Sequence, residues 1–433
     1  MKKRIVPFVS TLLFLASSLA MAETASHFTL KSLCRQANES AEQIRISAED
    51  VVLAKEDKKR ALSVLIPRAS TYGTYTNYRD EDSRSPDTIT YGAKLTQSFT
   101  LNGKELIAYD ISKRTIEQNE FTLGSVRSDY LLQVAEAYFN TLSAKRLEEI
   151  AAADVKRLET HRNSVQEKLN VGSVTKTDLF RAQAELSKSK TDKVVAEHRV
   201  LQNKAQIVQL TGVEPGFTIS DQDVPKELDN FMPILEEIRT TALNRRYEIK
   251  EAEKALEVAQ RSIKLKEGDF WPTLSLEGGY QESEMTYRSA TVPDTEMESA
   301  FLTAELQFTL YDGGLRRAEI RQSKAQERKA QEALSLAKKN VVLQTEVSYL
   351  EFETSRKTLI NLQDELRSAE ENWNAVSMQF KYGLADSIDL MDANTLLVTA
   401  QRRISNAQYD FYQAALKLIH TQGGLLDFLL TES

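Results

Sequence analysis

Most of the chain carries the hydrophobic pattern of long α-helices. Residues 104–171 contain one glycine and no proline, and residues 315–382 contain neither. Apolar side chains recur in these runs at spacings of three and four, with alanines and charged residues between them, as at Leu131, Val134 and Tyr138. At 1.5 Å per residue, each run predicts a helix about 100 Å long.

Each long run is followed by a glycine and then by a shorter helical run. The shorter runs, 173–211 and 384–422, again lack glycine and proline. Gly172 and Gly383 therefore mark the turns of two helical hairpins, because glycine readily adopts the left-handed backbone conformation that ends a helix. An apolar stripe on a charged helix is also typical of a solvent-exposed coiled coil, so the helices alone leave that interpretation open.

Two further segments have a hydrophobic period of two. Apolar and polar residues alternate within 91–101, and more regularly within 300–310. One face of such a strand suits hydrocarbon and the other suits water. The pattern predicts β-hairpins at about 69–101 and about 273–310, with strands long enough to cross a bilayer when tilted. Tyrosines near the strand ends favour a membrane interface, and a half-buried soluble sheet is the alternative.

The number of strands has a consequence for assembly. Four strands cannot close a membrane barrel, because the smallest membrane barrels have about eight strands and open edges are not tolerated in lipid. The chain is therefore predicted to oligomerise. Three copies would form a twelve-stranded barrel continued by a tube of twelve helices, although the sequence alone leaves two or four copies open.

The chain is a tandem duplication. An offset of 211 residues places Gln133 on Gln344, and an offset of 205 places Pro67 on Pro272. The predicted organisation is a signal peptide at 1–22, a first repeat at 23–220, a linker at 221–233 and a second repeat at 234–433.

The first 22 residues have the features of a secretory signal peptide, with a basic start, an apolar middle and the cleavage signal Ala20-Met21-Ala22. Its removal would lower the formal net charge of −7 by three, to −10. An acidic surface repels nucleic acid, so no nucleic-acid partner is expected. The single cysteine, Cys34, lies away from the cleavage point, so neither lipidation nor an internal disulfide is expected. No later segment is long and apolar enough to predict a membrane-spanning helix.

Three carboxylates follow the second turn at intervals of three residues. Asp386 is predicted to cap the next helix, and Asp389 to add charge where the helix dipole favours anions. Thr175 and Asp178 repeat this arrangement in the first copy. Capping does not account for Asp392, whose counterpart is an arginine. In a cyclic assembly, Asp389 and Asp392 would form rings of carboxylates that attract cations.

The duplicated layout is accompanied by four short motifs. They are WPTLSL at 271–276, FTLYDGG at 308–314, and the turn sequences LNVGSVTKTDL and KYGLADSIDLMDA. In order and spacing the mature chain resembles the TolC family of outer-membrane efflux and secretion ducts. The resemblance implies an α+β membrane protein whose trimer forms a 12-stranded β-barrel in the outer membrane, with four strands per chain, continued by a long α-helical barrel through the periplasm.

The resemblance also implies a function and partners. The expected protein is the passive exit duct of a tripartite efflux pump or type I secretion system, which docks to a periplasmic adaptor (a membrane fusion protein) and to an inner-membrane pump or ABC transporter. Asp389 and Asp392 match the aspartates that line the entrance constriction. The residues expected to meet the adaptor are those of the two turns, Val171, Gly172, Ser173, Tyr382, Gly383 and Leu384. The two glycines are equally well explained as helix C-caps.

One departure from the family concerns the closed tip. Ala385 and Phe380 stand where the family has a latching arginine and a tyrosine. A closed state of this chain must therefore rest on packing, on other polar pairs or on a looser tip.

No catalytic site, metal site or cofactor is expected. The four histidines are scattered and each is predicted to be a solvated helix residue, and no phosphate-binding glycine loop is present. The alternative from another class is a trimeric coiled-coil structural protein or adhesin anchored by a short β-barrel. Ion conduction after reconstitution distinguishes the two.

Overall fold

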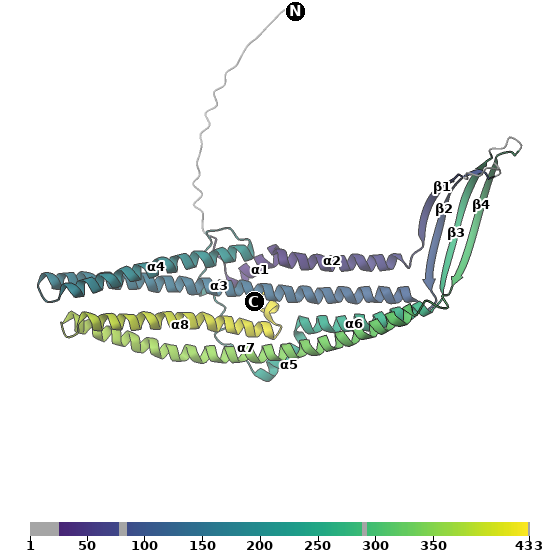
Figure 1. Ribbon diagram of the computed structural model, residues 1–433. Coiled ribbons are helices and arrows are strands. Elements are labelled where there is room, and N and C mark those ends of the chain that lie inside the picture. Colours follow the sequence, from purple (N-terminus) through teal and green to yellow (C-terminus); the bar gives the residue numbers. More distant parts are fainter. Residues whose placement is uncertain (1–25, 78–84, 288–291, 432–433) are drawn as a thin grey trace, which may run out of the picture.

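The computed structural model describes residues 26–77, 85–287 and 292–431, so the predicted signal peptide lies outside the described residues. The molecule is strongly elongated. The long helices run side by side along one axis, a four-stranded sheet extends from one end, and the two hairpin turns lie at the other end (Figure 1).

Four helices make up the two long hairpins. The first hairpin is α3 (Lys104–Asn170) with α4 (Lys176–Thr211), and the second is α7 (Leu315–Lys381) with α8 (Ser387–Thr421). Helices α3 and α7 have 67 residues each, and α7 begins and ends 211 positions after α3. Each helix ends one residue earlier than the sequence predicts, because Val171 and Tyr382 belong to the turns.

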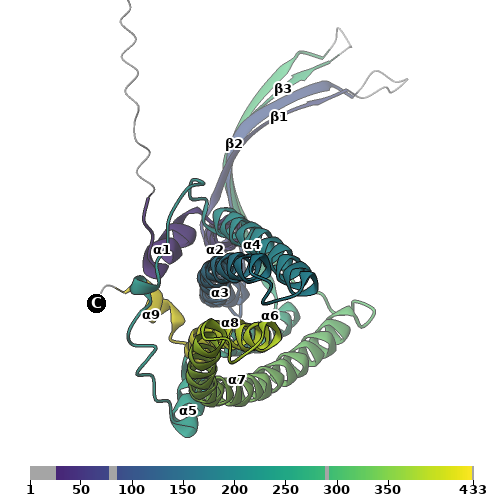
Figure 2. The ribbon, with the colours of Figure 1, turned by 90° about the vertical axis from the view of Figure 1, so that its left-hand side faces the viewer.

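The remaining helices flank this framework. Helix α2 (Glu42–Ser63) runs beside the half of α3 that is nearer the sheet. Helix α6 (Tyr247–Glu267) lies against both α3 and α7. The short helices α1 (Leu30–Ser40), α5 (Leu235–Arg245) and α9 (Leu425–Leu430) lie on the outside of the long hairpins (Figure 2). Two single turns of 3₁₀-helix complete the described helical segments, η1 (Asp221–Asp223) and η2 (Gly268–Phe270).

The sheet joins the two repeats. Its strands are β1 (Arg68–Thr76), β2 (Asp87–Thr100), β3 (Thr273–Thr286) and β4 (Thr295–Gln307), and all neighbours are antiparallel in the order β1-β2-β3-β4. The central pair β2 and β3 runs from Asp87 opposite Thr286 to Thr100 opposite Thr273. Phe308 and Leu310, assigned to the second hairpin from the sequence, lie beyond the end of β4. Within the described chain, the outer edges of β1 and β4 have no strand partner.

The largest hydrophobic core lies where α1, α9 and the segment after α4 pack onto the long helices. Aromatic side chains fill it: the ring centroids of Phe139 and Tyr412 are 5.5 Å apart, and Phe352 is fully buried beside them. The Tyr138 hydroxyl donates to the backbone oxygen of Ser220 at 3.2 Å, so its polar end stays satisfied inside the core.

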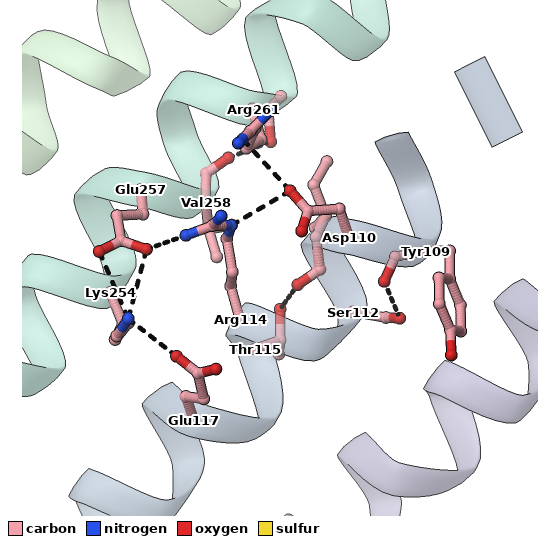
Figure 3. Close-up of polar contacts among 12 residues, drawn as sticks. Tyr109, Asp110, Ser112, Arg114, Thr115, Glu117, Lys254, Glu257, Val258 and Arg261 are labelled. Atoms are coloured by element: carbon pink, nitrogen blue, oxygen red, sulfur yellow. Dashed lines mark hydrogen bonds and ion pairs between the residues drawn. The ribbon is translucent and has the colours of Figure 1, made fainter. Parts of the chain in front are cut away.

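An ion-pair network joins α3 to α6 (Figure 3). Arg114 Nε lies 3.2 Å from Asp110 Oδ2, and its Nη1 contacts Glu257 on α6. Lys254 Nζ lies 2.8 Å from Glu117 Oε2 and so adds a second bridge between the helices. These side chains are partly exposed, so solvent screens each pair, but shared partners reduce the entropy cost of ordering them. The full network comprises Asp110, Arg114 and Glu117 of α3 and Lys254, Glu257 and Arg261 of α6.

Candidate functional site

The two helical turns have the same backbone geometry. Gly172 and Gly383 both have a φ of 75°, in the left-handed region that a side chain disfavours. Ser173 N–H donates to the oxygen of Lys168 at 2.9 Å, and Leu384 N–H donates to the oxygen of Gln379 at 2.8 Å. These bonds satisfy carbonyl groups that the helix ends leave free. The glycines therefore meet a local backbone requirement in both copies.

Reciprocal hydrogen bonds begin the helix after each turn. Asp178 Oδ2 accepts from Thr175 N–H at 2.8 Å, and Thr175 Oγ1 accepts from Asp178 N–H at 3.3 Å. In the second copy, Asp386 Oδ1 accepts from Asp389 N–H at 2.9 Å, while Asp389 Oδ2 accepts from Asp386 N–H at 3.1 Å. The bonds from the Thr175 hydroxyl and N–H lower the pKa of Asp178. Asp389 thus takes part in a capping box as well as presenting a carboxylate to solvent.

Asp392 has no comparable structural role. It lies on the exposed surface of α8, one turn after Asp389, and makes no hydrogen bond or ion pair with any residue in the described ranges. Both carboxylates are exposed at the end of the molecule that carries the turns. Because nothing in the fold of one chain requires Asp392, its charge is available for interactions outside the chain.

The exposed residues at the turns are large and apolar. Val171 is 79% exposed, Tyr382 is 70% exposed and Leu384 is 80% exposed. Gly172, Ser173 and Gly383 are exposed between them. Apolar side chains this exposed on two adjacent turns are typical of a contact surface for another protein.

Near the turns, His161 joins the two hairpins. His161 Nε2 lies 3.0 Å from Ser387 Oγ on α8, and its ring centroid lies 5.2 Å from that of Phe380 on α7. Lys168 Nζ donates to the oxygen of Phe380 at 2.9 Å and lies 3.7 Å from the centre of its ring. Phe380 thus packs against His161, and its backbone oxygen accepts from Lys168, at the position where the resemblance implies a tyrosine. Ala385 offers no polar side-chain group there.

The prediction that each histidine is a solvated helix residue is wrong for His161. It is only 6% exposed, and burial, followed by the nearby charge of Lys168, lowers its pKa. The sequence held a signal for this burial, since Leu158, His161 and Val165 follow the helical spacing of three and four and all three are buried. His27 departs from the prediction too, because it precedes α1. So does His420, whose side chain is 11% exposed and whose Nε2 lies 2.9 Å from Asp129 Oδ1.

The two faces of the sheet have opposite chemistry. On one face, Lys94 Nζ lies 3.1 Å from Glu277 Oε2, and Ser98 and Ser275 hydroxyls are 2.8 Å apart. On the other face, Leu302 is 83% exposed and Leu306 also lies open. Aromatic residues stand nearer the loops on this apolar face, namely Tyr75, Tyr91 and Tyr280. A strand set with one polar and one lipid-compatible face is typical of a membrane barrel with an aqueous interior.

The described residues hold few other groups that could carry chemistry. Within the described ranges, no group of three or more His, Cys, Asp or Glu side chains is arranged to hold a metal ion. None of the helices in those ranges is both long and apolar enough to span a membrane. Cys34 is fully buried, and its burial raises the pKa of the thiol.

Comparison with known proteins places these features in a family. The sequence model described as outer membrane efflux protein matches residues 33–213 and 238–424. The outer membrane protein TolC of Vibrio cholerae is 24% identical over 431 residues, which cover 98% of this chain and 96% of that protein. The alkaline protease secretion protein AprF of Pseudomonas aeruginosa is 22% identical over 316 residues, 70% of this chain and 63% of that protein.

The fold is also shared with solved structures. The MtrE outer membrane channel of Neisseria gonorrhoeae superposes with a TM-score of 0.77 at 17% identity, over 92% of this chain and 89% of that one. The predicted fold class is confirmed by this likeness, and the relatives are channel proteins. Since the family model matches most of the sequence in two successive stretches, the chain belongs to the outer membrane efflux protein family.

Proposed function

We propose that three copies of this chain close into a single passive conduit that crosses the outer membrane and continues into the periplasm. The observation that carries the proposal is the two-faced sheet, whose outer strands β1 and β4 have unpaired edges within the described chain. Unpaired backbone groups are not tolerated in lipid, so each β4 edge must meet the β1 edge of another copy. The number three rests on the family resemblance.

The long helices carry a second surface that one chain leaves uncovered. Leu336, Leu343, Val347 and Leu350 of α7 are all exposed, at spacings of seven, four and three. Such a stripe matches the core seam of a coiled coil, so a helix of a neighbouring copy is its natural partner. The edges of the sheet and the apolar stripe of α7 therefore both require neighbouring copies of the chain. A closed ring of copies would enclose the polar face of the sheet.

Reconstitution tests this assembly. The purified full chain should run as a trimer by light scattering with detergent correction, and it should conduct ions in a planar bilayer. A monomer, or a trimer that never conducts, would contradict the conduit. Conduction would also reject the coiled-coil structural protein or adhesin, which the channel relatives already disfavour.

Within the conduit, we assign Asp389 and Asp392 to a cation-selective constriction. Asp389→Ala is an unsuitable test because it also removes the acceptor of the Asp386 N–H. Asp389→Asn plus Asp392→Asn keeps a hydrogen-bond acceptor and removes only the charge. The ratio of K⁺ to Cl⁻ permeability should fall towards one. The matched control is Glu327→Gln plus Glu332→Gln, a half-buried and an exposed carboxylate of α7 far from the turns, which should leave that ratio unchanged.

Cargo reaches this conduit from inner-membrane and adaptor partners, and the chain itself performs no chemistry in this account. We assign adaptor docking to the turn residues described above. Tyr382→Ser plus Leu384→Ser should abolish export in cells while bilayer conductance stays normal, because the exposed side chains serve contact and the backbone turn is retained. Equal loss of conductance would instead indicate a defect in folding or assembly.

A further inference from the structure

A groove lies between the two helical hairpins near their turns. It has a volume of about 560 Å³, within the range of small-molecule sites. Its walls are the last third of α3 and the last turns of α7, with Leu390 of α8 between them. We call it the basic groove after the residues that define it, Lys156, Arg157, His161, Lys168, Trp373 and Lys381.

The basic groove concentrates positive charge in an acidic protein. Four of its residues are lysine or arginine and none of its lining residues is acidic, although the whole chain has a net charge of −7. Lys156 and Lys381 are exposed and form no ion pair with any residue that the structure describes. Arg157 is already engaged, since its Nε donates to Asn394 Oδ1 at 2.9 Å. The two exposed lysines are therefore the free cations of the groove within those ranges.

A neighbouring groove shows that this arrangement is not general. Between α4 and α8, Arg402 Nη2 lies 3.1 Å from Asp192 Oδ2, and Glu185 and Lys188 stand in the same lining. Positive and negative groups are matched there. The basic groove, lined by α3, α7 and α8, differs from this neighbour in having unmatched positive charge.

The floor of the basic groove is apolar and partly aromatic. Phe380 and Leu390 are buried, and Trp373 is half-buried against the same cluster. A half-buried indole leaves part of its surface for an apolar or aromatic ligand to pack against. The groove therefore combines an anion-attracting rim with an apolar floor.

We propose that the basic groove binds small organic anions in which one carboxylate or sulfonate is carried on an aromatic or alkyl body. The anionic group would contact Lys156, Lys381 would add positive charge further along the rim, and the body would pack on Trp373. Lys156 belongs to the first hairpin, and Lys381 and Trp373 belong to the second, so a bound anion bridges the two hairpins. This binding does not depend on the conduit function proposed above.

Tryptophan fluorescence provides a direct test. The chain has two tryptophans, Trp271 and Trp373, so Trp271→Phe leaves a single reporter in the groove. The probe is 5-dimethylaminonaphthalene-1-sulfonate, which accepts energy from tryptophan. Titration of the purified full chain in non-ionic detergent should quench Trp373 emission to saturation. In the same background, Lys156→Gln plus Lys381→Gln should weaken binding roughly tenfold, the combined effect of removing two exposed positive charges.

Two controls separate specific binding from adsorption. Lys324→Gln plus Lys339→Gln removes two exposed lysines of α7 that make no ion pair within the described ranges, and it should leave the affinity unchanged. The neutral 5-dimethylaminonaphthalene-1-sulfonamide should bind more weakly than the sulfonate. Equal affinity for the two probes, equal weakening by both lysine pairs, or no saturable quenching would overturn the proposal.

Discussion

Gly124 allows α3 and α6 to approach closely. It is the one glycine of α3 and it is buried. A Cβ added at this position would lie 2.6 Å from two carbon atoms of the Tyr247 ring and 3.0 Å from a third. Favourable carbon contacts need about 3.5–4.0 Å, so Gly124→Ala forces either the ring or the helix to move.

The expected cost has two parts of opposite sign. Adding a methyl group to a packed site costs about 1–3 kcal/mol. Replacing glycine with alanine inside a helix recovers about 0.8–1.0 kcal/mol. Gly124→Ala should therefore destabilise the chain by up to about 2 kcal/mol. In a Tyr247→Ala background the ring is gone, so the same change should stabilise by close to 1 kcal/mol.

A double-mutant cycle measures this reversal. Wild type, the two single variants and the double variant are unfolded in denaturant and followed by the helical circular dichroism signal. Ser125→Ala, the next position of α3, serves as a control and should change stability by less than about 0.5 kcal/mol. If Gly124→Ala destabilises both backgrounds equally, contact with Tyr247 is not the reason for the glycine.

Three further predictions concern the helices. Thr175→Ala or Asp386→Ala should each cost about 1 kcal/mol locally, seen as faster hydrogen exchange in the following first turn, whereas Thr175→Ser should not. Burial and Lys168 lower the pKa of His161, so the unfolded chain binds its proton more readily. The stability from neutral His161 is fully present above pH of about 6.5 and declines below it, and His161→Gln should flatten the fall in unfolding free energy between pH 7 and 5. Arg114→Ala should cost roughly 1 kcal/mol after solvent screening, and the cost should shrink when unfolding is measured in 1 M NaCl.

The long helices and their turns were predictable because the signals are local. Apart from Gly124, the 67 residues of α3 contain no glycine or proline. Gly172 then follows two residues after the end of the helix. The capping boxes were likewise readable from spacing alone, since donor and acceptor are three residues apart. Strand ends were less well defined, because alternation continues past Gln307 into Phe308 and Leu310 although pairing with β3 stops.

The contacts between the hairpins were not predictable in the same way. His161 lies 226 positions from Ser387, and no local pattern says that they meet. Residue type also gives the wrong prediction here. Histidine is usually solvent-exposed, but this one lies on the apolar stripe of α3 and is buried with it. The basic groove has the same origin, since Lys156 and Lys381 belong to different repeats and line one groove only when the two hairpins pack through α3 and α8.

The duplication separates what the fold requires from what it leaves free. Both turns keep the glycine, the left-handed backbone and the reciprocal cap, so these features are explained by folding. Asp392 and its counterpart Arg181 differ in charge at equivalent exposed positions, and one turn of backbone geometry cannot account for the difference. In a cyclic trimer the six turns would be nearly equivalent in shape, yet the pair of carboxylates would recur only at the second turn of each copy. In that trimer, the charge at the tip would follow threefold symmetry while the backbone would approach sixfold symmetry. The role of Asp392 is therefore to be sought in the assembly and its ions rather than in the stability of one chain.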